Sequence, residues 1–108
     1  MPDRKGQLLD MLARQPDEVF LRFALAMEHV KLGEDDQALA AFGRVIKLDP
    51  SYTAAYTQRA ALCEKLSRFD EAKATYRRGI ASANARGDHH AASKMQETLD
   101  RLVRVTGQ

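Results

Sequence analysis

Histidine and cysteine are the side chains of this sequence best suited to metal binding or nucleophilic catalysis. It contains three histidines and one cysteine. His89 and His90 are adjacent, and because neighbours on a helix point about 100° apart, they cannot comfortably hold one metal ion. The lone Cys63 excludes an internal disulfide and a CxxC metal site. We therefore expect His29 and Cys63 to be packing residues, and the two adjacent histidines to lie in a solvated first turn of a helix.

Known catalytic motifs are missing from the sequence. It has no Walker glycine loop, no GxSxG and no HExxH. The acidic run Glu34–Asp36 lacks the alternating oxygen ligands of a calcium loop and suits the positive end of a helix dipole. We accordingly predict no enzymatic activity, no metal site and no cofactor.

Positive charge is slightly in excess and unevenly placed. The formal net charge is +2, and residues 59–108 hold ten Lys and Arg against six Asp and Glu. Arg77, Arg78 and Arg86 lie near the end of a predicted helix, where we expect them to favour its negative dipole end. A nucleic-acid surface would need more charge and interleaved aromatic residues. The charge pattern therefore argues against nucleic acid as a partner.

Composition indicates one small helical domain spanning residues 1–108. Hydrophobic residues make up 44% of the 108 residues, charged residues 30% and aromatic residues only 6%. Alanine is abundant, which favours helix over sheet. No apolar run approaches the roughly 20 residues that a membrane span needs, and no signal peptide follows the first charged residues. We expect a cytoplasmic protein, with an Ala- and Arg-rich composition that suits a bacterium.

An internal repeat, with a period of about 34 residues, organises the chain. Pro16 and Pro50 are separated by one such period. The same offset joins small, aliphatic, acidic and aromatic pairs: Ala26 and Ala60, Leu32 and Leu66, Asp36 and Asp70, Ala38 and Ala72, Phe42 and Tyr76, Ile46 and Ile80. So many matches of residue type in one register indicate a structural repeat.

The period and the matching residues resemble the tetratricopeptide repeat, a helix–turn–helix unit that stacks into a solenoid. The residues that match are Leu25, Ala26, Gly33, Ala38, Phe42 and Pro50 in one repeat, and Tyr56, Ala60, Ala72 and Tyr76 in the next. The repeats are degenerate, because Arg22 replaces the large aromatic residue near the start and Asn84 replaces the closing proline. The resemblance implies an all-α fold of antiparallel helical hairpins stacked as a short right-handed solenoid.

The repeat also predicts the helices. We expect them at about residues 3–14, 17–32, 36–48, 52–66, 69–84 and 88–104, with repeats over 17–50 and 51–84. The helix over 88–104 has one apolar stripe and a charged back, as a C-terminal capping helix needs. The helix over 3–14 corresponds to the second half of a repeat. It is expected either as a bare N-terminal cap or, alternatively, as a surface on which the solenoid continues in a partner.

Local signals support this register. Ala26 and Ala38 are expected to face each other within a hairpin, where small side chains allow close helix approach. Gly33 suits the left-handed residue that ends a helix. Ser67, three residues before Asp70, is interpreted as a capping-box-like start of the helix over 69–84.

The resemblance places the first helix of each repeat along a concave groove. The candidate partner-binding residues there are Phe20, Phe23, Met27, Val30, Thr57, Gln58, Ala61, Glu64 and Lys65. Phe20, Phe23 and Met27 form a second apolar stripe on a helix that Leu21, Leu25 and Leu32 are expected to anchor in the core. Such a helix needs another surface on that side, unless the two phenylalanines are themselves structural.

These positions predict a protein-interaction module that binds a peptide or a partner helix. Some members of the family hold a peptide carboxylate with groove Lys and Asn residues, but Phe23 and Met27 occupy the first of those positions here. The alternative in the same class is a homodimer formed through the apolar stripe. Nucleic-acid binding and a role as an accessory enzyme subunit are the remote alternatives.

Overall fold

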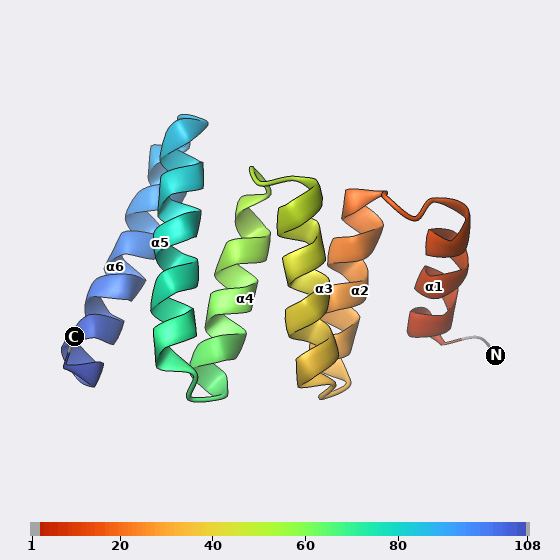
Figure 1. The fold of residues 1–108 in the computed structure, drawn as a ribbon, viewed down its shortest axis with the longest axis horizontal. Coiled ribbons are helices and arrows are strands. Elements are labelled where there is room, and N and C mark those ends of the chain that lie inside the picture. Colours follow the sequence, from red (N-terminus) through yellow and green to blue (C-terminus); the bar gives the residue numbers. More distant parts are fainter. Residues whose placement is uncertain (1–2, 108) are drawn as a thin grey trace. The chain divides into compact units, whose positions relative to one another are not determined.

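The computed structural model describes residues 3–107, which form six helices and no strand over that range. The helices are α1 (Arg4–Arg14), α2 (Val19–Lys31), α3 (Asp35–Leu48), α4 (Thr53–Lys65), α5 (Phe69–Ala85) and α6 (His89–Thr106) (Figure 1). Every end lies within two residues of its predicted position. The prediction of an all-α helical repeat is confirmed.

The helices group into two compact units that meet in the sequence at Asp49 and Pro50. The N-terminal unit holds α1–α3 and the C-terminal unit holds α4–α6. The division falls within one residue of the predicted boundary between the repeats. The single-domain organisation over residues 1–108 stays a prediction.

The N-terminal unit is built on the α2–α3 hairpin. Ala26 and Ala38 have no exposed surface, as expected for the small residues that let these helices approach. Phe42 and Val45 of α3 are also fully buried. The short helix α1 packs on α2, where Leu8 and Leu12 form an apolar cluster with Leu25, Leu21 and Ala24.

Polar contacts also tie α1 to the turn that precedes α3. Lys5 Nζ donates to Glu34 Oε2 at 2.9 Å, and His29 Nδ1 lies 2.9 Å from Glu34 Oε1. The bond from Lys5 and then the bond to His29 hold the pKa of the Glu34 carboxyl below its usual range. His29 is half-buried and has this hydrogen-bond partner, which agrees with the expectation that it is a packing residue.

The C-terminal unit repeats the hairpin and adds one helix. Ala60 of α4 and Ala72 of α5 have no exposed surface, like their counterparts one repeat earlier. Helix α6 packs on α5 with its predicted apolar stripe buried. The buried residues of that stripe are Ala92, Met95, Leu99 and Leu102.

Three of the turns place a residue in the left-handed region: Gly33 at φ 73°, Ser67 at φ 60° and Gly87 at φ 80°. Gly33 was predicted, but the capping-box interpretation of Ser67 was wrong. Ser67 ends α4, since its N–H donates to the Glu64 carbonyl at 2.9 Å, and α5 begins after Arg68 without a side-chain cap. Ser67 is the counterpart of Gly33 in the next repeat, so the repeat itself indicated this conformation.

No helix within residues 3–107 is both long enough and apolar enough to cross a membrane.

Candidate functional site

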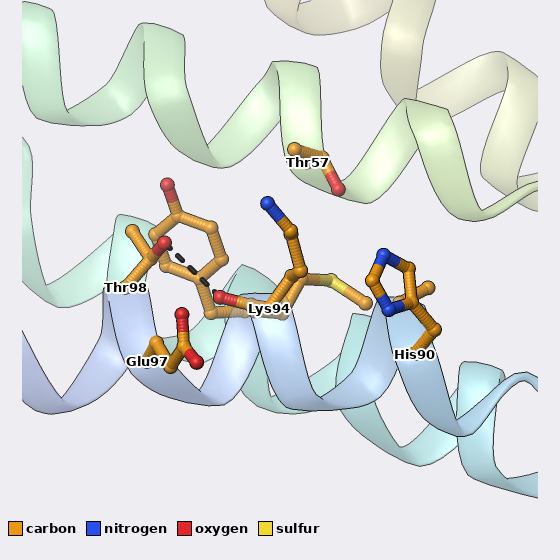
Figure 2. Close-up of a pocket in the computed structure, with 8 residues that line it drawn as sticks. Thr57, His90, Lys94, Glu97 and Thr98 are labelled. Atoms are coloured by element: carbon orange, nitrogen blue, oxygen red, sulfur yellow. Dashed lines mark hydrogen bonds between the residues drawn. The ribbon is translucent and has the colours of Figure 1, made fainter.

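A pocket of about 430 Å³ opens in the C-terminal unit between α4 and α6, with α5 behind it (Figure 2). We call it the α4–α6 pocket. Its lining residues are Thr57 from α4, Tyr76 from α5, and His90, Ala91, Lys94, Met95, Glu97 and Thr98 from α6. The lining is mostly apolar, and it includes the polar side chains of Thr57, Lys94, Glu97 and Thr98.

Helical periodicity brings the α6 residues of this pocket together. His90, Lys94 and Glu97 are spaced four and three residues apart, so they share one face of the helix. The Lys94 side chain extends from α6 toward Thr57 (Figure 2). Thr98 lies one turn beyond Lys94 and donates from its hydroxyl to the Lys94 carbonyl at 3.2 Å. The pocket thus presents a cation, a carboxylate and two hydroxyls around an apolar base.

A hydrogen-bond network fixes the base of the pocket. The Tyr76 hydroxyl donates to Glu64 Oε2 at 2.6 Å, and Arg101 donates to Glu64 Oε1 at 2.9 Å. Burial and the bond to Glu64 together raise the pKa of Tyr76 far above its usual value. Glu64 therefore joins α4, α5 and α6, so this predicted binding residue already has two partners inside the unit.

The other α4 residues predicted to bind a partner differ in their exposure and in whether they line the pocket. Thr57 lines the pocket. Gln58 is half-buried, whereas Ala61 and Lys65 are exposed. None of these three lines the α4–α6 pocket.

In the N-terminal unit the predicted apolar stripe contains one strongly exposed residue. Phe20 is 64% exposed. The expectation that Leu32 anchors α2 in the core was wrong, because Leu32 is the C-cap residue of α2 and is 50% exposed. Phe23, Met27 and Val30 are half-buried. The ring of Phe23 packs against that of Phe42, with centroids 5.9 Å apart. Phe23 thus contributes to the core of the unit, while Phe20 projects into solvent.

The repeats match a known family model. The model for the tetratricopeptide repeat matches residues 21–52 and 53–86. The chain belongs to the tetratricopeptide repeat family. Domains of this family generally mediate protein–protein interaction and are typically non-catalytic.

Relatives of this tetratricopeptide repeat chain occur in bacteria and plants. A TPR repeat-containing protein of Pseudomonas aeruginosa is 28% identical over 95 residues, which cover 88% of this chain and 90% of that protein. The SGT1 homolog of Oryza sativa is 35% identical over 78 residues, 72% of this chain, and the match spans only 21% of the rice protein. A tetratricopeptide repeat domain of Salinibacter ruber has a TM-score of 0.76 at 36% identity, covering 81% of this chain and 88% of that one.

The α6 wall of the pocket was not among the binding residues predicted for this tetratricopeptide repeat protein. Lys94 and Glu97 were assigned to the charged back of a capping helix, and His90 to a solvated turn. His90 is indeed exposed, but it also lines the pocket. The repeat offset relates Thr57, Ala61 and Glu64 to Ala91, Met95 and Thr98. Treating residues 88–104 as the first helix of a further repeat would therefore have identified these three lining residues, but not His90, Lys94 or Glu97.

The residues that could have supported other chemistry are used in packing or lie apart. Cys63 is fully buried, as predicted, and burial raises the pKa of its thiol. Its sulfur lies 3.9 Å from Arg59 Nη1. Among residues 3–107, no three His, Cys, Asp or Glu side chains gather in an arrangement that could hold a metal ion.

Proposed function

We propose that the chain is a non-catalytic protein-interaction module that binds a peptide segment of a partner protein in the α4–α6 pocket. The observation that carries the proposal is the lining of this pocket, in which apolar surface is surrounded by Thr57, Lys94, Glu97 and Thr98. Concave, mainly apolar sites with a few convergent polar groups are typical of binding sites.

The lining suits a peptide chain. Ala91, Met95 and the Tyr76 ring offer contact surface to an apolar side chain. Thr57 can donate to or accept from a peptide group, while Lys94 donates and Glu97 accepts. The bonds from Tyr76 and Arg101 to Glu64 hold the walls before any partner arrives. A preformed surface reduces the ordering cost of binding.

A Thr57→Arg substitution tests the pocket directly. Thr57 is exposed, so a larger side chain there should fill the pocket and leave the fold intact. Peptides selected by the wild-type protein from a displayed random library should bind the variant at least about tenfold more weakly, a loss of about 1.4 kcal/mol. Fluorescence polarisation of the selected peptides measures this change.

The matched control is Ala74→Arg, an equally bulky change at an exposed position of α5 outside the pocket lining. Its affinity should equal that of the wild type. Undiminished binding by Thr57→Arg, or selection of no peptide at all, would contradict the proposal.

Phe20, Phe23, Met27 and Val30 remain proposed as a second contact surface, and the exposed Phe20 favours self-association as a second candidate function. Leu9 and Met11 in α1 are also exposed, by 47% and 39%. Burial of such side chains against a second copy would stabilise a homodimer. We expect light scattering to show a mass that rises with protein concentration, and Phe20→Glu to keep the chain monomeric.

Leu32→Glu is the control for this experiment, because it replaces another exposed apolar residue, 50% exposed, at the opposite end of α2. That variant should associate as the wild type does. A wild-type protein that stays monomeric over the whole concentration range would exclude the homodimer and leave the proposed peptide pocket unaffected.

A further inference from the structure

A second pocket of the C-terminal unit, about 410 Å³ in volume, lies where the last turns of α5 meet the residues that precede α4. We call it the α5 pocket. It is lined by Pro50, Ser51, Tyr56, Ser82, Ala85 and Arg86. It shares no lining residue with the α4–α6 pocket, and its surface is mostly apolar.

Hydrogen bonds hold the walls of the α5 pocket in place. The Pro50 carbonyl accepts from the Tyr56 hydroxyl at 2.7 Å and from the Ser82 hydroxyl at 2.6 Å. Arg86 Nη1 donates to the Ser51 carbonyl at 2.6 Å. The segment before α4 is thereby fastened to α5, so the pocket exists without a ligand.

Arg86 lines this pocket, and Arg78 lies on the same face of α5. Arg78 shares the pocket face of α5 with Ser82 and Ala85, and its guanidinium carbon lies 5.8 Å from the centroid of the Tyr56 ring. Arg77 and Arg78 are exposed, as is Arg86. Among the described residues, no Asp or Glu oxygen lies within 4.0 Å of these three guanidinium groups.

The sequence expectation that these arginines cap α5 is wrong for two of them. Helix α5 continues to Ala85 and has no basic residue in its last turn, so Arg77 and Arg78 lie too far from its end to complement the dipole. Only Arg86, the C-cap residue, lies close enough to the end of α5 to complement the dipole. No Asp or Glu occurs between Glu71 and Asp88. The positive charge of this helix face is therefore not balanced within its own element.

We propose that the α5 pocket is a second interaction surface, which binds an acidic segment of a partner protein. An apolar side chain of the segment enters the pocket, and carboxylates on either side of it pair with Arg78 and Arg86. Arg86 has one N–H committed to Ser51 and retains other donors for a carboxylate. Nucleic acid fits less well, because Tyr56 is only 3% exposed and therefore offers no stacking platform.

The test uses a labelled peptide that alternates Glu and Leu, the same peptide with Lys in place of Glu, and a single-stranded oligodeoxynucleotide of equal charge. Only the Glu peptide should saturate the wild-type protein, with an affinity that falls as salt is added. Amide shifts in an NMR titration should change at Ser82, Ala85 and Arg86. Arg78→Glu should weaken binding at least about tenfold.

Two further variants separate charge from folding effects. Arg104→Glu makes the same charge change at an exposed site of α6 outside this pocket and should alter affinity by less than about twofold. Ala85→Trp fills the pocket without changing the charge and should also abolish saturation. Equal binding of the Lys peptide, tighter binding of the oligodeoxynucleotide, or shift changes at Thr57 and Lys94 instead would overturn the proposal.

Discussion

Gly79→Ala should destabilise the C-terminal unit by about 1–3 kcal/mol, although alanine is the better helix former. A Cβ on Gly79 would lie 2.8 Å from Tyr56 Cβ and 2.7 Å from Met95 Sδ. The methionine can swing aside, but Tyr56 Cβ is fixed to the backbone of α4. The cost of forcing these helices apart therefore exceeds the roughly 1 kcal/mol gained in helix propensity. Urea unfolding followed by circular dichroism measures the difference.

Gly43→Ala provides the matched control. Gly43 also lies inside a helix, but a Cβ there would meet nothing within 4 Å. Only the helix-propensity gain should remain, and the variant should be stabilised by about 0.5–1 kcal/mol. If both alanine variants were more stable than the wild type, the close contact between α4 and α5 at Gly79 would be refuted.

Ala72→Leu should be at least as damaging, with an expected loss of about 3 kcal/mol in the free energy of unfolding. Ala72 has no exposed surface and belongs to α5, which packs on α4. A leucine cannot be accommodated there without separating the hairpin. Ala38→Leu should have the same effect in the N-terminal unit, because Ala38 is the counterpart of Ala72 one repeat earlier and is equally buried.

The repeat supplies its own controls for these two variants. Ala40 and Ala74 are also counterparts in successive repeats, lie two positions beyond Ala38 and Ala72, and are exposed. Leucine at either position should change stability by no more than about 0.5 kcal/mol. A loss below about 0.5 kcal/mol for Ala72→Leu would be inconsistent with close packing at the paired alanines.

The repeat period predicted most of the fold. It located the paired alanines, the turn at Gly33 and all six helices, since each of these depends on local chemistry that recurs along the chain. Ser67 was misassigned because serine is a common N-cap residue, and this local rule was preferred over the correspondence with Gly33. The repeat register would have given the correct conformation.

Features that depend on the meeting of separate helices were not predictable in the same way. Gly79 shows nothing unusual within α5, and its importance comes from the position of Tyr56 on α4. Thr57 was predicted for the binding site, but the opposite wall with Lys94 and Glu97 becomes visible only when α6 is placed on α5. Glu64 was predicted to bind a partner protein. Its actual partners, Tyr76 and Arg101, lie 12 and 37 residues away in the sequence, so the sequence did not reveal these bonds.

Because Cys63 is buried, its reaction with a thiol reagent can report how often the C-terminal unit opens. Its thiol has no exposed surface, and its raised pKa keeps it protonated at neutral pH. Since this is the only cysteine of the chain, covalent labelling by a thiol reagent must follow an opening of the unit that exposes this thiol. The labelling rate of the unmodified protein therefore measures how often this unit opens, and a bound partner that stabilises the unit would slow it.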